Sequence, residues 1–288
     1  MSVSTSQQIA RYFNEFSTQE VTFTKDVIRA TMLQPKQVFL KISGYQFPCI
    51  IYSASLIGAK VIVNFHEGFK EILKKSNNAC SLRFSFQQRD KSDPLTFFVS
   101  GKVSGLTPYG EQKPELQFMN IQYTQRPPDD LIEIIGALLE ANVNAKRRKE
   151  ERVVVTNDSI RKLGLKGKGA VVLVDGIPRK GILRDISFSG AKVIILGVAK
   201  FLVNKQAILR LDLLDPAEQV QLPGQILRFE AVEGRNDIAA YAIKFEDEQV
   251  PMEYKMRLNQ YLRALRKSPI SKGPGAGAVG GGRRRFGR

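Results

Sequence analysis

Apolar and polar residues alternate along several short segments of the chain, and this period of two is typical of β-strands with one buried face. The alternating apolar residues are Val38, Leu40 and Ile42 in the segment from Lys36 to Ile42, then Leu82, Phe84 and Phe86, then Leu209, Leu211 and Leu213, and finally Tyr241, Ile243 and Phe245. Two of these segments lie in each half of the chain. We therefore expect both halves to be rich in half-buried strands.

Two other segments have the period of a helix. One helix is predicted to begin after the two prolines and two aspartates of residues 127–130, and the other at Pro251. The expected apolar faces are Leu131, Ile135, Leu138 and Leu139 in the first helix, and Leu258, Tyr261, Leu262 and Leu265 in the second. Each strand-rich half therefore ends in a helix.

The two halves also share an internal repeat, which indicates architecture when catalytic motifs are few. SASLIGAKVIV, from Ser53 to Val63, aligns without gaps with DISFSGAKVII, from Asp185 to Ile195. We predict a mainly β fold of two tandem β-barrels, each followed by a C-terminal helix and joined by a helix-containing linker. The expected segments are a first barrel at 1–126, a helix and arginine linker at 127–151, a second barrel at 152–268 and a disordered Gly/Arg tail at 269–288.

Charge adds a partner class to this picture. The chain has 44 Lys and Arg against 28 Asp and Glu, a net charge of +16, and part of the excess lies in the Gly- and Arg-rich tail. Such an excess predicts an anionic partner. No stretch reaches the roughly 20 apolar residues that span a bilayer, and the N-terminus lacks the pattern of a signal peptide. We expect a cytoplasmic protein.

Residue types that carry catalysis or bind metals are scarce. His66 is the one histidine, and Cys49 and Cys80 are the two cysteines. These are too few for a zinc site, and no motif supplies a nucleophile for a triad. We therefore expect no enzyme, no metal and no cofactor, and we expect His66 to be a surface or helix-capping residue.

The segment AKRRKEERVVV, which follows the first predicted helix, carries three clustered arginines, Arg147, Arg148 and Arg152. A guanidinium is always charged and offers paired donors that match phosphate oxygens or the O6 and N7 edge of guanine. Basic residues are also favoured at a helix C-terminus by the helix dipole, so a solvated helix end would be the better explanation of these arginines if they stood alone.

Asp185, Ser187 and Gly190 lie further along the chain than Arg152, in the segment DISFSG. Asp185 could accept from guanine ring nitrogens or orient an arginine, Ser187 could bond a phosphate oxygen, and Gly190 allows close approach of the backbone. A tight turn between strands would again explain the three alone. Together with the arginines they indicate a guanine-nucleotide site without a catalyst.

The two copies differ in charge at these positions. The alignment that pairs Asp185 with Ser53, continued without gaps, pairs Arg152 with Glu20 and Arg148 with Phe16. If the protein recognises an anion, only the second copy has the charges for it.

The arginines and the D-x-S-x-x-G turn together resemble the PilZ domain, a bacterial receptor domain for cyclic di-GMP, over about residues 147–266. The whole chain resembles the two-domain PilZ proteins of the PlzA type, whose N-terminal PilZ-like barrel lacks the ligand motif. The resemblance implies that Arg148 and Arg152 wrap over the ligand while Asp185, Ser187 and Gly190 hold it against the barrel. A basic residue at the position of Arg147 implies binding of an intercalated ligand dimer.

The resemblance further implies a change in domain arrangement on ligand binding, an unidentified downstream protein, and a role in motility or virulence. The sequence leaves two other classes open. A nucleic-acid-binding protein would use the +16 charge and the arginine tail, and its affinity would fall steeply with salt. A scaffold that only docks proteins would have no nucleotide affinity.

Overall fold

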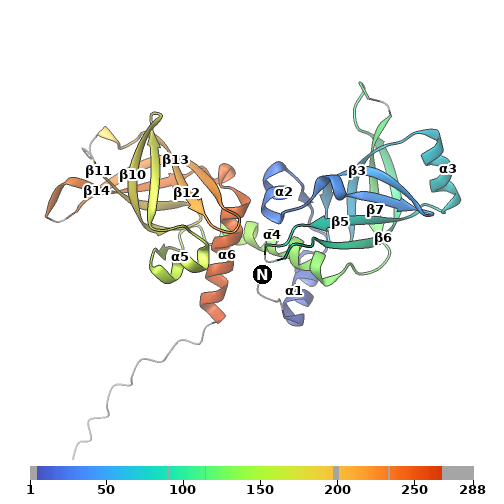
Figure 1. The fold of residues 1–288 in the computed structure, drawn as a ribbon, viewed down its shortest axis with the longest axis horizontal. Helices are drawn as coiled ribbons and strands as arrows, with labels where there is room; N and C mark the ends of the chain where they lie inside the picture. Colours follow the sequence, from blue (N-terminus) through green and yellow to red (C-terminus); the bar gives the residue numbers. More distant parts are fainter. Residues whose placement is uncertain (1–4, 90, 114, 197–200, 233, 268–288) are drawn as a thin grey trace, which may run out of the picture.

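The computed structural model describes residues 5–89, 91–113, 115–196, 201–232 and 234–267, so the tail predicted for 269–288 lies outside it. The fold is mainly β, with two closed barrels side by side and helices α4 (Asp129–Arg147) and α6 (Met252–Lys267) between them (Figure 1). This confirms the predicted fold class. No helix in the described part of the chain is both long and apolar enough to cross a membrane.

The first barrel is closed by six antiparallel strands in the order β3-β2-β5-β6-β7-β4, with β4 paired back to β3 and a short β1 added beside β3. The strands are β1 (Val21–Thr22), β2 (Phe39–Ile42), β3 (Tyr45–Ala54), β4 (Gly58–Asn64), β5 (Ala79–Phe86), β6 (Leu95–Pro108) and β7 (Leu116–Tyr123). The accompanying helices are α1 (Ser6–Phe16), α2 (Lys25–Thr31), the 3-10 turn η1 (Pro35–Gln37) and α3 (Glu67–Lys75).

The second barrel has the corresponding order β10-β9-β12-β13-β14-β11, closed by the pairing of β11 with β10 and extended by β8 beside β10. Its strands are β8 (Val153–Val154), β9 (Gly169–Val174), β10 (Ile177–Ile186), β11 (Gly190–Leu196), β12 (Gln206–Leu213), β13 (Glu218–Val232) and β14 (Arg235–Phe245). Helix α5 (Asn157–Leu163) and the 3-10 turn η3 (Asp247–Gln249) complete it.

The internal repeat predicted from the sequence is present in the structure. The ungapped alignment that pairs Ser53 with Asp185 carries β1, α2, β3 and β4 onto β8, α5, β10 and β11 with the same ends. Even an irregularity is shared, because the pairing of β3 with β4 shifts between Ile51 and Ser53, and that of β10 with β11 shifts between Leu183 and Asp185. The two barrels are therefore copies of one structure.

The predicted alternation marks the barrel cores. Its apolar positions are all buried: Val38, Leu40, Ile42, Leu82, Phe84, Phe86, Leu209, Leu211, Leu213, Tyr241, Ile243 and Phe245. The predicted strand from Lys36 was too long, since Pro35 opens η1 and β2 begins only at Phe39. Leu265 was wrongly placed on the buried face of α6, because the helix extends beyond the barrel there and leaves it 46% exposed.

The short helices were not predicted. Each begins at a side-chain cap rather than at a long apolar stripe, with Thr5 capping α1, Thr24 capping α2 and Thr156 capping α5. His66 caps α3 by accepting the Phe69 N–H at Nδ1 (3.3 Å), which confirms its predicted role.

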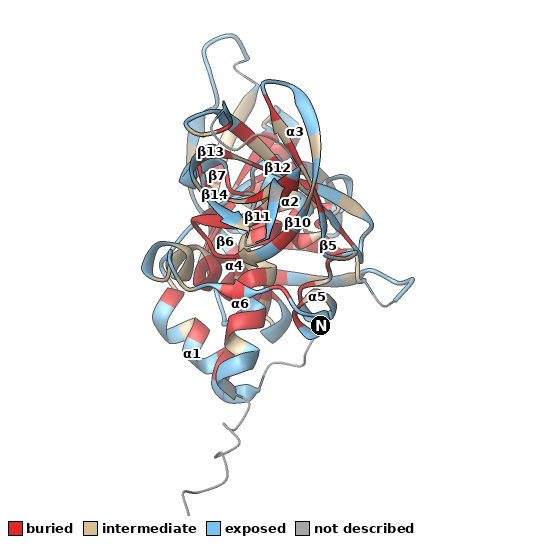
Figure 2. Cartoon of the chain, turned by 90° about the vertical axis from the view of Figure 1, so that its left-hand side faces the viewer, coloured by how far each residue is buried: buried red, intermediate tan, exposed pale blue. Residues whose placement is uncertain are grey.

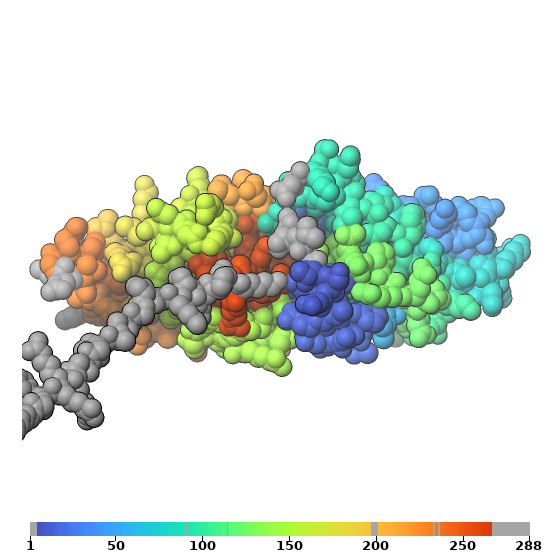
Figure 3. Space-filling model, turned by 90° about the horizontal axis from the view of Figure 1, so that it is seen from below, coloured from blue at the N-terminus to red at the C-terminus, as the bar shows by residue number. Residues whose placement is uncertain are grey.

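Helices form the contact between the two barrels. Helix α6 contacts both α4 and α2, and α1 contacts α4. Asp26 on α2 accepts the backbone N–H of Met252 at the start of α6 (2.7 Å), so a first-barrel residue satisfies a free donor of a second-barrel helix. Figure 2 shows the buried faces of α1 and α6 in red, and Figure 3 shows α1 in dark blue at the middle of the molecule.

Candidate functional site

Helix α4 delivers the predicted arginines to the second barrel. It starts with Asp129 and Asp130 and ends with Lys146 and Arg147, an order of charges that the helix dipole favours at both ends. Arg148 is the C-cap, and its backbone N–H is bonded to the Asn144 carbonyl (2.8 Å). The Arg147 side chain is exposed and that of Arg148 is half-buried.

Polar contacts anchor the linker after α4 to the second barrel and its helix. The carbonyl of Lys149 accepts both the backbone N–H and the hydroxyl of Ser189 (3.2 and 2.9 Å). The Lys149 ammonium pairs with Asp247, and Glu151 pairs with Arg266 on α6 (2.8 Å). The chain therefore crosses the turn that contains Ser189 one residue after Arg148.

Arg152 and Asp185, which are 33 residues apart in the sequence, form an ion pair between Nη1 and Oδ1. The two are brought together because β8, which begins at Val153, pairs with the end of β10, so that Val154 lies opposite Asp185. The Arg152 side chain is 41% exposed and that of Asp185 18% exposed. Of the two roles predicted for Asp185, the one seen is the orientation of an arginine.

Ser187 and Gly190 shape the turn between β10 and β11. The Ser187 hydroxyl and backbone N–H both donate to the Gly190 carbonyl (3.2 and 2.8 Å), and Ser187 has no exposed surface. A Cβ on Gly190 would lie 2.3 Å from the Ile243 carbonyl oxygen, so only glycine permits this approach of β11 to β14. That Ser187 contacts a ligand directly stays a prediction.

The first barrel contains the same turn without the charges. Ser55 bonds the Gly58 carbonyl through its hydroxyl and its backbone N–H (3.3 and 2.8 Å), and a Cβ on Gly58 would lie 2.7 Å from the Ile121 carbonyl oxygen. Where the second barrel has the Arg152 and Asp185 pair, the first has a hydrogen bond from the Ser53 hydroxyl to Glu20 (3.0 Å). The turn is common to both copies, and the arginines are particular to one.

The site therefore presents cations that are available to an anion. Arg147 and Arg148 have no ion pair within the described residues, and Arg152 has one with a partly exposed acid. No cluster of His, Cys, Asp and Glu in the described ranges could hold a metal ion. The arrangement can bind and orient an anionic, planar molecule.

Sequence reasoning missed the residues that support this turn from behind. Tyr254 on α6 is buried and donates its hydroxyl to the Ser187 carbonyl (2.7 Å). Ser189 occupies a variable position of the motif, yet it holds the linker. Neither residue type signals such a role, because both contacts depend on how distant segments meet.

Tyr254→Phe should lower the free energy of unfolding by about 1 kcal/mol, the usual worth of one buried hydrogen bond, because the Ser187 carbonyl would lose its partner. Tyr241→Phe is the matched control, since the buried Tyr241 hydroxyl has no hydrogen-bond partner in the part of the chain described. Urea unfolding followed by circular dichroism measures both. Equal effects of the two substitutions would contradict the role of Tyr254.

Comparisons with known proteins agree with this organisation. The PilZN3 domain model matches residues 7–142, and the PilZ domain model matches residues 146–264. A protein of Treponema denticola, described as a cyclic di-GMP binding protein, is 44% identical over 275 residues, covering 96% of this chain and 87% of that protein.

Solved structures are similar at lower identity. The Borreliella burgdorferi PlzA protein in complex with c-di-GMP is 22% identical with a TM-score of 0.40, covering 89% of this chain and 98% of that one. YcgR from Escherichia coli in complex with c-di-GMP is 12% identical with a TM-score of 0.28, covering 84% and 87%. On the strength of the two domain matches and the Treponema relative, the chain belongs to the PilZ domain family, with a PilZN3 domain followed by a PilZ domain.

Proposed function

We propose that this protein is a receptor for cyclic di-GMP that binds its ligand between the arginine linker and the Asp185–Gly190 turn. The observation that carries the proposal is the contrast between the two barrels. Both have the turn, but only the second pairs an arginine, Arg152, with an aspartate, Asp185, and has two further arginines in the linker just before Arg152. The name of the Treponema denticola relative, a cyclic di-GMP binding protein, supports the same ligand.

The chemistry of the ligand fits these groups. Cyclic di-GMP has two phosphates and two guanines, and guanidinium groups recognise both through paired hydrogen bonds. Asp185 holds the Arg152 guanidinium by one terminal nitrogen at the barrel wall. Exposed ion pairs contribute only about 0–1 kcal/mol, so Arg152 can exchange part of this contact for a ligand at little cost.

The arginines and the turn residues of the proposed site have different roles. Arg148 and Arg152 close over the ligand, and Arg147 adds a third charge that favours a stacked ligand pair. Ser187 and Gly190 keep the turn flat against β14, so that the ligand can approach the backbone. The protein works without a metal or cofactor and catalyses no reaction.

Ligand binding would also change how the two domains are arranged. The linker is held by Ser189, Asp247 and Arg266, all on the second barrel or its helix. A ligand that binds the bent form of the linker more tightly than the extended form shifts the population toward the bent form. The contacts of the linker with Ser189, Asp247 and Arg266 must then be replaced by others. Because α4 continues directly into the linker, the change passes to the first domain, where a downstream protein that controls motility or virulence would detect it.

Arg148→Ala and Arg152→Ala should each weaken cyclic di-GMP binding at least about tenfold, because a charge-assisted hydrogen bond is worth roughly 1.5–3 kcal/mol. Asp185→Ala should also weaken binding. Isothermal titration calorimetry measures the affinity and whether one or two ligands bind.

Two controls separate the site from general charge. Arg161→Ala removes one exposed charge from α5 of the same domain, and Ser53→Ala alters the equivalent of Asp185 in the first barrel. Both should bind like the unaltered protein. Unchanged affinity in the Arg148 and Arg152 variants would refute the proposed site.

The proposed rearrangement can be followed by energy transfer between dyes on Lys75→Cys in α3 and Lys162→Cys in α5. Native Cys49 and Cys80 are buried and should not react. Saturating cyclic di-GMP should change the transfer efficiency, and the same pair carrying Arg148→Ala and Arg152→Ala should show no change at that concentration. If the transfer efficiency of the protein with the intact site stays constant when cyclic di-GMP is added, the domains do not move.

The net charge of +16 favours nucleic acid as a second candidate ligand. Binding through the phosphate backbone should fall by orders of magnitude between about 50 and 200 mM salt, and deletion of residues 268–288 should remove most of it. Fluorescence anisotropy with a labelled oligonucleotide measures both. Oligonucleotide affinity that survives salt and deletion would place this function elsewhere than in the tail.

A further inference from the structure

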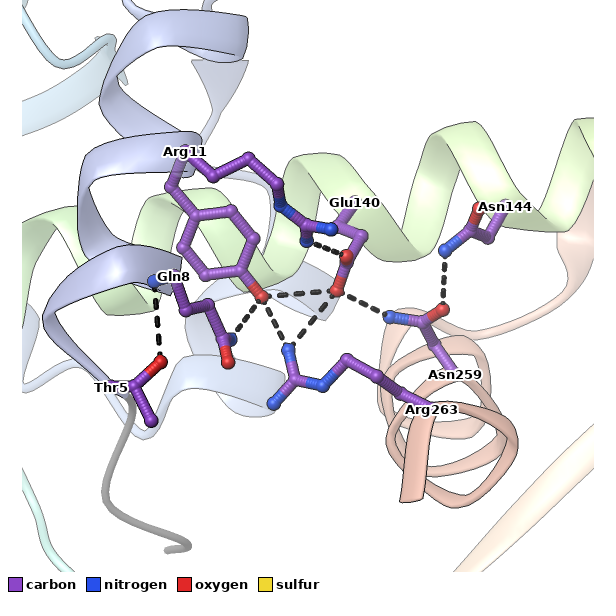
Figure 4. A network of polar contacts seen from close by, with 8 residues as sticks. Thr5, Gln8, Arg11, Glu140, Asn144, Asn259 and Arg263 are labelled. Carbon is purple, nitrogen blue, oxygen red and sulfur yellow. Dashed lines mark hydrogen bonds and ion pairs between the residues drawn. The ribbon is translucent and has the colours of Figure 1, made fainter. Parts of the chain in front are cut away.

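Glu140 lies at the point where three helices of the two domains meet (Figure 4). It is on α4, two turns before the arginines, and is only 8% exposed. Its carboxylate pairs with Arg11 and accepts from Tyr12 (3.0 Å), both on α1. On α6 it accepts from Asn259 (3.1 Å) and pairs with Arg263 (3.2 Å). One buried carboxylate therefore joins both domains to α4.

This carboxylate is charged at neutral pH. Burial alone would raise the pKa of Glu140, but the hydrogen bond from Tyr12 and the charges of Arg11 and Arg263 outweigh it, so its pKa lies below the usual value. Burial and the neighbouring carboxylate raise the pKa of Tyr12 to about 12, which keeps its hydroxyl a donor. Glu140 and the four side chains that contact it are called the hub below. The hub is a cluster of cations and donors whose geometry depends on the negative charge of Glu140 at its centre.

A relay of amides connects the hub to the end of α4. Asn259 donates to Glu140 through Nδ2 and accepts from the Asn144 amide at Oδ1 (2.7 Å). The backbone carbonyl of the same residue, Asn144, accepts the backbone N–H of Arg148. Glu140, Asn144 and Arg147 are spaced i, i+4 and i+7, so they lie along one face of the helix. The last turn of α4 is therefore fixed to α6 on the face that leads to the arginines.

Helix α6 holds the other half of the site as well. Tyr254 on α6 bonds the Ser187 carbonyl of the turn, and Arg266 pairs with Glu151 of the linker. One helix, α6, thus holds the turn, the linker and the end of α4. Binding sites hold their geometry best when the contacting residues are fixed by such a supporting layer.

We infer that Glu140 is a positioning residue for the cyclic di-GMP site: by fixing α4 to α6 through Asn259 and Arg263, it places Arg147 and Arg148 over the Asp185–Gly190 turn. This inference rests on the proposed function. The Glu140 contact lies between the domains, more than one helical turn from any predicted ligand contact. In this inference it supplies the preorganisation of the site on which ligand affinity depends.

The test is a double-mutant cycle on Glu140→Gln and Arg148→Ala, with cyclic di-GMP affinity measured by titration calorimetry on the full chain. Glu140→Gln keeps the side-chain shape but removes the charge, and should weaken binding at least about fivefold. If Glu140 acts through the arginines, adding Glu140→Gln to Arg148→Ala should cost little more. Asn144→Ala, which breaks the relay without removing a charge, should weaken binding in the same direction.

Glu253→Gln is the matched control for a general loosening of the interface. Like Glu140, Glu253 is a buried carboxylate, but it lies on α6. It binds two arginines, Arg89 of the first domain (2.7 Å) and Arg257 (2.5 Å). Among the hydrogen bonds and ion pairs of the described residues it has no contact with α4. This variant should retain the affinity of the unaltered protein, and thermal unfolding of every variant shows that each is folded at the titration temperature.

Three results would overturn the inference while leaving the proposed function intact. They are unchanged affinity of Glu140→Gln, a loss that simply adds to that of Arg148→Ala, and an equal loss in Glu253→Gln. An unaltered protein that does not bind cyclic di-GMP would instead refute the proposed function, and the inference with it.

Discussion

The contact between Arg152 and Asp185 organises the second barrel's site, because it attaches the charged linker to the barrel wall. The pair is partly exposed and so contributes little to stability. Its importance is geometric, because it fixes the Arg152 guanidinium beside the turn. The other contacts of the linker, to Ser189 and Arg266, act in the same direction.

Duplication of the barrel separates what the fold requires from what a ligand requires. Ser55 and Gly58 repeat the hydrogen bonds and close strand approach of Ser187 and Gly190, in a barrel that has neither arginine nor aspartate at the other positions. The serine and glycine of the turn are therefore needed for the fold, whereas the charges are not. Natural variation between two copies in one chain serves here as an internal control.

Much of the fold was predictable from the sequence, and the interface between the domains was not. Alternation in β5 and β12 and the repeat that pairs Ser53 with Asp185 are local patterns, so the strands and the two-barrel architecture follow from them. That Asp185 could orient an arginine was expected from the chemistry of a carboxylate, but that Arg152 would be this arginine was not predicted. Glu140, Tyr254 and Ser189 carry no local signal, because their roles arise from helices and turns that meet in three dimensions.

The most direct measurement is a crystal structure of the full chain grown with cyclic di-GMP. The account predicts the ligand against the outer wall of the second barrel at the Asp185–Gly190 turn, with the guanidinium groups of Arg148 and Arg152 bonded to its phosphates or guanines. A ligand bound elsewhere, or bound at this turn with both side chains directed into solvent, would contradict it.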